Sequence, residues 1–217
     1  MNDSLIIAQT ITFVKKELKN AEGGHDWFHI ERVYRNAILI SKTEKVDSFI
    51  VSLGVLLHDI ADSKFYNGNE AIGPKKASDF LNYEKVPEDV ISHVIKIIEN
   101  ISFKGGKKKQ QFFSNELAVV QDADRLDALG AIGIARCFNY GGYKNRKLYN
   151  PEIKPKLNML PEVYKASNSP TINHFYEKLL LLKDKMNTKT GKQIAQKRHE
   201  YMEGFLEQFY GEWEGEL

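Results

Sequence analysis

The strongest constraint on the fold of this chain is the helical spacing of its apolar residues. They recur three and four positions apart in most windows, whereas the period-two alternation typical of strands is rare. The pattern therefore predicts an all-α protein with a compact multi-helix fold. The expected helices cover about residues 4–18, 26–44, 47–59, 75–81, 87–100, 115–138, 171–186 and 190–213. Loops are expected at 62–73 and 143–170, and the second is long enough for a lid or a substrate-binding role.

One of these segments is apolar nearly all round, as expected for a central buried helix. It reads Phe-Ile-Val-Ser-Leu-Gly-Val-Leu-Leu and leads directly into His58 and Asp59. Two polar side chains at the end of a buried helix are costly unless they are paired or coordinated. Metal ligation is one solution, and a hydrogen-bonded His-Asp pair with a structural role is the alternative.

Bulk composition narrows the class of protein. The 217 residues fit one domain, 1–217, and their 42% hydrophobic and 28% charged residues are ordinary for a globular protein. A net charge of +2 leaves no global excess that attracts nucleic acid or a membrane surface, although residues 104–109 form a short basic, glycine-containing loop. No run approaches the about 18 apolar residues of a membrane helix. The only cysteine, Cys137, is expected to be a buried thiol, and its isolation favours a reducing, cytoplasmic location.

Two further histidines lie upstream, in the run Gly-His-Asp-Trp-Phe-His-Ile-Glu-Arg-Val. His29 is expected inside a helix, which makes it the steadier metal ligand. His25 is expected at the start of that helix, where an indirect or substrate-binding role fits better than ligation. The alternative is an ordinary helix N-terminus capped by Asp26.

A third polar cluster, Asp122-Ala-Asp124-Arg125-Leu-Asp127, interrupts an otherwise apolar helical pattern. Its apolar flanks argue against a merely solvated face. Asp122 and Asp124 point about 200° apart on a helix, so a single metal ion is expected to contact only one of them. We predict Asp124 as the metal ligand, with Asp122 as the alternative.

The order His29, then His58-Asp59, then Asp124 resembles the H…HD…D signature of the HD-domain phosphohydrolase superfamily. The surrounding motifs are similar to those of small bacterial HD hydrolases, a group that includes nucleoside triphosphate pyrophosphohydrolases, over about residues 11–213. The resemblance implies that these four residues bind one divalent cation, with Mn, Mg, Fe, Co and Zn all compatible with nitrogen and oxygen ligands. Two-metal members carry further histidines before the last Asp, and this chain has only His93 there, which favours one metal.

The resemblance also suggests roles around the metal. Asp62 falls where related enzymes keep an acid that orients or deprotonates the attacking water. Lys64, Arg125 and His25 are candidates for contacts with substrate phosphates, although Lys64 and Arg125 are equally suited to structural salt bridges.

The expected activity is hydrolysis of a nucleotide or other phosphate ester, with a nucleoside or deoxynucleoside triphosphate cleaved to monophosphate and pyrophosphate as the favoured reaction. A nucleotidase or phosphodiesterase, including one acting on an alarmone, is the second enzymatic hypothesis. A non-catalytic nucleotide sensor is the third, and the complete ligand set weighs against it. The oligomeric state, the physiological metal and the pathway are left open.

Overall fold

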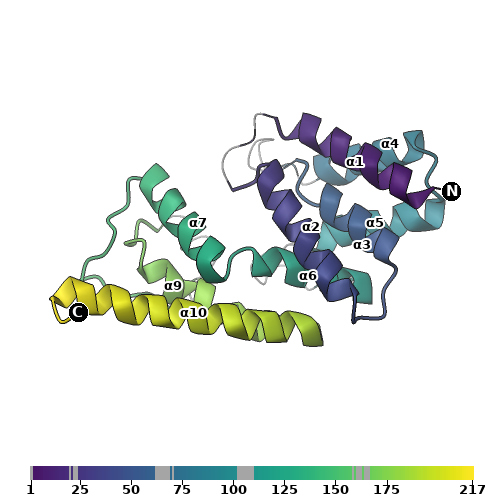
Figure 1. The fold of residues 1–217 in the computed structure, drawn as a ribbon. Helices are drawn as coiled ribbons and strands as arrows, with labels where there is room; N and C mark the ends of the chain where they lie inside the picture. The colour runs from purple at the N-terminus through teal and green to yellow at the C-terminus, as the bar shows by residue number, and fades with distance from the viewer. Residues whose placement is uncertain are drawn as a thin grey trace. The chain divides into compact units, whose positions relative to one another are not determined.

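The structure is a computed structural model that describes residues 2–19, 21, 24–61, 69, 71–101, 110–157, 159, 163 and 167–217. Every regular element among these residues is a helix, which confirms the all-α prediction (Figure 1). The chain divides into two compact units, residues 1–124 and 125–217. The expectation that 1–217 form a single domain stays a prediction, and each unit is described by itself.

The first unit is built around a central helix, α3. Its helices are α1 (Asp3–Glu17), α2 (Trp27–Ser41), α3 (Ser48–Leu57), α4 (Ile72–Tyr83), α5 (Glu88–Asn100) and α6 (Asn115–Leu126), the last of which contains the unit boundary. Helix α3 packs against α1, α2 and α5, and α4 packs against α5. The short helix predicted from residue 75 begins earlier, at Ile72.

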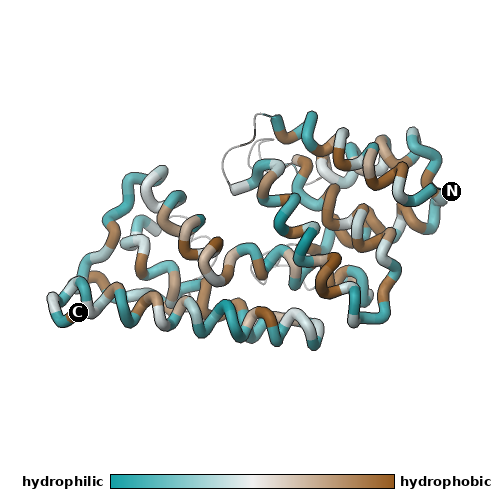
Figure 2. Tube along the Cα trace, in the orientation of Figure 1, coloured by the Kyte–Doolittle hydropathy of each residue, from teal (hydrophilic) through white to brown (hydrophobic). Residues whose placement is uncertain are grey.

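Helix α3 occupies the centre of the first unit because nearly all of its side chains are apolar. Leu53, Leu56 and Leu57 are fully buried, and the α3 tube in Figure 2 is mostly coloured hydrophobic. Asp47 caps its N-terminus by accepting hydrogen bonds from two backbone N–H groups of the first turn. Gly54 lets α5 come close, since a methyl group there would lie 3.2 Å from the Ile97 side chain. The predicted central buried helix is confirmed.

The long helix predicted over 115–138 is wrong in one respect, because it is broken after Leu126. Leu129 is extended and Gly130 has a φ of +70°, a left-handed conformation that favours glycine. The chain then starts a new helix, α7 (Gly130–Tyr143). The chain also remains helical beyond residue 138, the expected end, because Gly141 and Gly142 lie inside α7.

The second unit contains α7, α9 (Asn173–Glu177), the 3₁₀ turns η2 (Leu179–Leu181) and η3 (Lys183–Lys185), and α10 (Lys189–Glu214). The single helix predicted over 171–186 is therefore wrong: Lys178, with φ −145° and ψ −55°, leaves the helical region and ends α9. Helix α10 was predicted correctly. Thr188 caps its start, Gly215 closes it at a φ of +73°, and its colour alternates in Figure 2 as expected for a half-buried helix.

Aromatic rings form part of the core of the second unit. Phe205 of α10 stacks on Phe175 of α9 at 5.8 Å and meets Phe138 of α7 edge-on at 5.9 Å. Cys137, the residue before Phe138, is buried, as the sequence predicts. Burial raises the pKa of its thiol to about 12, which fits a structural role. Among the described residues, none of the helices is long and apolar enough to cross a membrane.

Candidate metal centre

Helix α2 presents His29 one turn after its start. Asp26 is the N-cap, as predicted, and its carboxylate accepts a hydrogen bond from the His29 backbone N–H at 3.0 Å. This cap fixes where the helix begins and therefore which way His29 points. The imidazole is buried in the first unit, where it would be costly without a polar partner or a ligand.

His58 directly follows α3 and is oriented by that helix. Its Nδ1 lies 2.7 Å from the carbonyl oxygen of Val55, so Nδ1 carries the proton and donates it. The other nitrogen, Nε2, then has its lone pair available as a ligand, which is the arrangement typical of metal-binding histidines. The rings of His29 and His58 lie 5.7 Å apart.

Asp59 completes a compact group with these two histidines. One ligand atom each from His29, His58 and Asp59 lies within 4.8 Å of the others. That spacing is suitable for ligands around one cation, because each metal–ligand bond measures about 2.0–2.2 Å. The donor set of two imidazole nitrogens and a carboxylate oxygen fits a divalent metal ion.

His25 lies beside this group and contacts Asp59. Its Nδ1 is 2.6 Å from the second carboxylate oxygen of Asp59. Burial alone would raise the pKa of Asp59, but the hydrogen bond with His25 and the charges of the three histidines outweigh it and lower the pKa. Asp59 is therefore ionised at neutral pH, as a metal ligand must be.

Asp124 places a second carboxylate near His29 and His58. One of its oxygens lies 3.5 Å from Nε2 of His29 and 3.9 Å from Nε2 of His58. The neighbouring Ala123 carbonyl accepts a hydrogen bond from Asn36 of α2 at 3.3 Å, which holds α6 against α2. Asp122, by contrast, is fully buried. This geometry favours Asp124 over Asp122 as the fourth ligand.

The described part of the chain does not cover every predicted site residue. Asp62 and Lys64 lie outside the described residues. Arg125 donates to the backbone carbonyl of Lys185 at 2.6 Å, a contact within the second unit. His93 lies 2.9 Å from the Ser114 hydroxyl and 3.5 Å from a carboxylate oxygen of Glu116, in keeping with the structural role expected of it.

Two features of the site were not found from the sequence. Asn36 was not singled out, although a polar residue on the buried face of a helix, between Val33 and Ile40, is a recognisable signal. The pairing of His25 with Asp59 depends on the path of the chain before α2, which no periodic pattern encodes.

Comparisons with known proteins identify the family. The family model described as HD domain matches residues 27–129. An uncharacterized protein of Bacillus subtilis (strain 168), YpgQ, is 38% identical over 201 residues, covering 92% of this chain and 90% of YpgQ.

Solved structures are similar over nearly the whole chain. An HD-superfamily hydrolase from Bacillus thuringiensis is 47% identical, with a TM-score of 0.80 over 98% of this chain and 99% of that one. The structure of Bacillus subtilis YpgQ in complex with ADP is 33% identical, with a TM-score of 0.76 over 98% and 97%.

Proposed function

The chain belongs to the HD-domain family of divalent-metal-dependent phosphohydrolases, and from that premise we propose that its substrate is a nucleotide. The favoured reaction is cleavage of a nucleoside or deoxynucleoside triphosphate to the monophosphate and pyrophosphate. The observation that carries the proposal is the convergence of His29, His58 and Asp59 within 4.8 Å. The nucleotide part is supported by the ADP complex of the related protein YpgQ.

We propose that His29, His58, Asp59 and Asp124 hold one divalent cation. The two Nε2 atoms supply nitrogen ligands and the two carboxylates supply negative charge, a mixture that suits Mn, Fe, Co or Zn and also admits Mg. When bound, such a cation supplies positive charge to phosphate oxygens and lowers the pKa of a water molecule. The residues around it bind and orient the substrate and move protons.

His25 is best suited to a positioning role. Its hydrogen bond to one oxygen of Asp59 fixes the orientation of that carboxylate next to His29 and His58. Partners of this kind orient ligands and strengthen their binding to a metal. A direct contact between His25 and a substrate phosphate is the alternative, and it would use Nε2, since Nδ1 is bonded to Asp59.

The remaining roles are proposed from the sequence. Asp62 follows Asp59 by three residues, and we assign it to orienting or deprotonating the attacking water. Lys64 is assigned to a substrate phosphate. Arg125 already uses one donor on the Lys185 carbonyl, so a phosphate contact would have to come from its remaining N–H groups.

The test is hydrolysis by the metal-stripped protein, followed by ³¹P NMR, which distinguishes pyrophosphate from orthophosphate. Nucleoside mono-, di- and triphosphates are supplied with Mn²⁺, Mg²⁺, Co²⁺ or Zn²⁺ in turn. We compare His58→Gln with His93→Gln, because both remove a histidine from the first unit and only His58 belongs to the metal group.

Pyrophosphate and monophosphate formed only with metal, and lost in His58→Gln but not in His93→Gln, support the proposal. Orthophosphate as the product would replace the pyrophosphohydrolase with a nucleotidase. Tight metal-dependent nucleotide binding without turnover would refute hydrolysis of these substrates and favour a sensor.

A further inference from the structure

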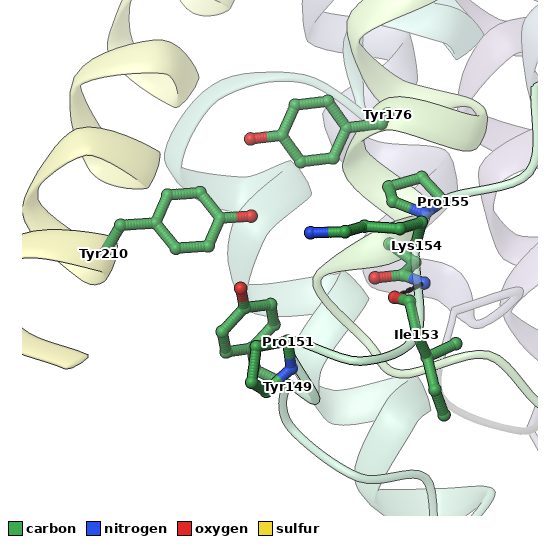
Figure 3. A pocket seen from close by; sticks show the side chains of 8 residues that line it. Tyr149, Pro151, Ile153, Lys154, Pro155, Tyr176 and Tyr210 are labelled. Atoms are coloured by element: carbon green, nitrogen blue, oxygen red, sulfur yellow. Dashed lines mark hydrogen bonds between the residues drawn. The ribbon is translucent and has the colours of Figure 1, made fainter. Parts of the chain in front are cut away.

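The second unit contains a pocket with a volume of about 330 Å³, and no function has yet been assigned to it. Its walls come from the segment 149–155 after α7, from α9 and from α10 (Figure 3). The volume lies at the lower end of the range, about 300–1,000 Å³, that is typical of small-molecule sites. None of the His and Asp residues of the metal group lines it.

Polar ends of four side chains converge in this pocket. Figure 3 shows the hydroxyl groups of Tyr149, Tyr176 and Tyr210 and the amino group of Lys154 pointing toward one another. These residues come from three separate segments of the chain. Of the described residues that line the pocket, none carries a carboxylate that would neutralise the lysine.

The phenol of Tyr210 is held in its neutral form. Burial, the hydrogen bond with Tyr176 and the electrostatic influence of Tyr176 and Tyr149 raise the pKa of Tyr210. A phenol that does not ionise still offers its O–H. The pocket therefore combines three phenol hydroxyls, two of which are hydrogen-bonded to each other, with the amino group of Lys154, the only charged side chain among the described residues that line it.

Two of the tyrosines are held in place by ring contacts, whereas Lys154 is exposed. The Tyr149 ring meets the Tyr210 ring edge-on at 5.4 Å and the Trp213 ring at 5.0 Å. The buried Asn173 donates from its side-chain amide to the carbonyl of Ile153 at 3.0 Å, which ties the 149–155 segment to α9. Donors fixed before binding cost less entropy to engage than donors that must be ordered.

We propose that this pocket binds the phosphate group of a small organic phosphate. A phosphate presents oxygens in several directions, so that donors from different sides of the pocket can be used at once, whereas a carboxylate presents only two oxygens. The rest of the ligand would lie against the apolar wall formed by Pro151, Ile153 and Pro155. The proposed phosphate site shares no residue with the metal group.

Trp213 provides a direct reporter, because its ring is in contact with Tyr149. Replacing the only other tryptophan, Trp27→Phe, leaves Trp213 as the single tryptophan of the full-length protein. Its fluorescence is titrated with inorganic phosphate and with phenyl phosphate, once with Mn²⁺ present and once with a chelator. We expect saturable binding of both under both conditions, with phenyl phosphate the tighter because its ring reaches the apolar wall.

Two variants locate the binding. Lys154→Met removes the ammonium group, and we expect phosphate to bind at least about tenfold more weakly, the loss typical of one hydrogen bond to a charged group. Tyr176→Phe keeps the ring and removes one O–H, with an expected loss of about fivefold. Lys156→Met is the matched control, an exposed lysine two residues away that does not line the pocket.

The absence of a saturable response of Trp213 would overturn the proposal, and so would a response seen only with Mn²⁺. Equal losses in Lys154→Met and Lys156→Met would also overturn it, since they would indicate a general charge effect. None of these results depends on whether the protein hydrolyses nucleotides.

Discussion

Replacing His25 by glutamine removes the imidazole that holds one oxygen of Asp59 at 2.6 Å. Without His25, the Asp59 carboxylate is free to rotate until a metal ion binds. The conformational entropy that it loses on binding then weakens the affinity for the metal. Losing such an orienting partner typically weakens metal affinity by about 10- to 100-fold. The His25 and Asp59 side chains are 33% and 19% exposed, so water replaces part of the lost contact. We therefore expect about a tenfold loss, equivalent to about 1.4 kcal/mol.

The assay is the electron paramagnetic resonance signal of free Mn²⁺, titrated into metal-stripped protein at pH 7.5. It measures the Kd for metal without any catalytic readout, so a change in substrate binding does not enter. His93→Gln is the matched control, because His93 lies in the same unit and contacts Ser114 and Glu116 instead of Asp59. Thermal unfolding of each metal-free variant checks that the first unit remains folded.

A Kd for His25→Gln within about twofold of the parent would refute the positioning role, since the expected loss is several times larger. So would an equal loss in His93→Gln. An unchanged Kd combined with a raised KM would instead favour direct contact of His25 with the substrate.

Two further predictions concern the stability of the second unit. Gly133→Ala is expected to destabilise it by about 1–3 kcal/mol, because the new methyl group would collide with the backbone carbonyl of Ala128. Gly142→Ala lies in the same helix, has nothing near the added methyl group, and is expected to stabilise the unit by about 0.5–1 kcal/mol. Chemical denaturation measures the free energy of unfolding of both variants. A change in the same direction in both would contradict the packing argument. Burial, with smaller contributions from nearby cations, lowers the pKa of His174 from 6.5 to about 4, so the unfolded chain takes up a proton at higher pH than the folded one. The free energy of unfolding is therefore expected to fall by about 1–2 kcal/mol between pH 7.5 and pH 5, and His174→Gln should lose this pH dependence.

The first unit was largely predictable because its signals are local. The all-round apolar pattern of α3 predicts burial, and the Asp residues at positions 26 and 47 act as the helix caps that their types suggest. Helical geometry separates Asp122 from Asp124, and the structure has the second of these near the two histidines. Its role as a ligand remains a proposal.

The break between α6 and α7 could not be predicted, because apolar spacing continues across it. Leu126 and Leu129 are three apart and both buried, so the pattern reads as one helix. The break is defined by the left-handed Gly130 and by the buried Asp127, whose carboxylate accepts a hydrogen bond from Arg136 at 2.6 Å. These are tertiary interactions between residues with no distinctive sequence spacing.

The pocket lined by Tyr149, Tyr176 and Tyr210 could not be predicted from the sequence either. Tyr149, Tyr176 and Tyr210 are separated by more than twenty residues in each case, and each belongs to a different segment. Aromatic residues are common in cores, so their types alone indicated packing rather than a site. Only the folded second unit brings their hydroxyl groups together.

The contact between His58 and the Val55 carbonyl has a consequence for the way in which His58 can bind a metal ion. Val55 lies in the last turn of α3, where backbone carbonyls run out of helical partners. Its oxygen selects which tautomer of His58 exists before any ion arrives. An ion that binds at Nε2 would meet a ring already oriented by this hydrogen bond, so the ring would not need to turn. The end of a core helix thereby sets the tautomer and orientation of a side chain as well as a boundary of secondary structure.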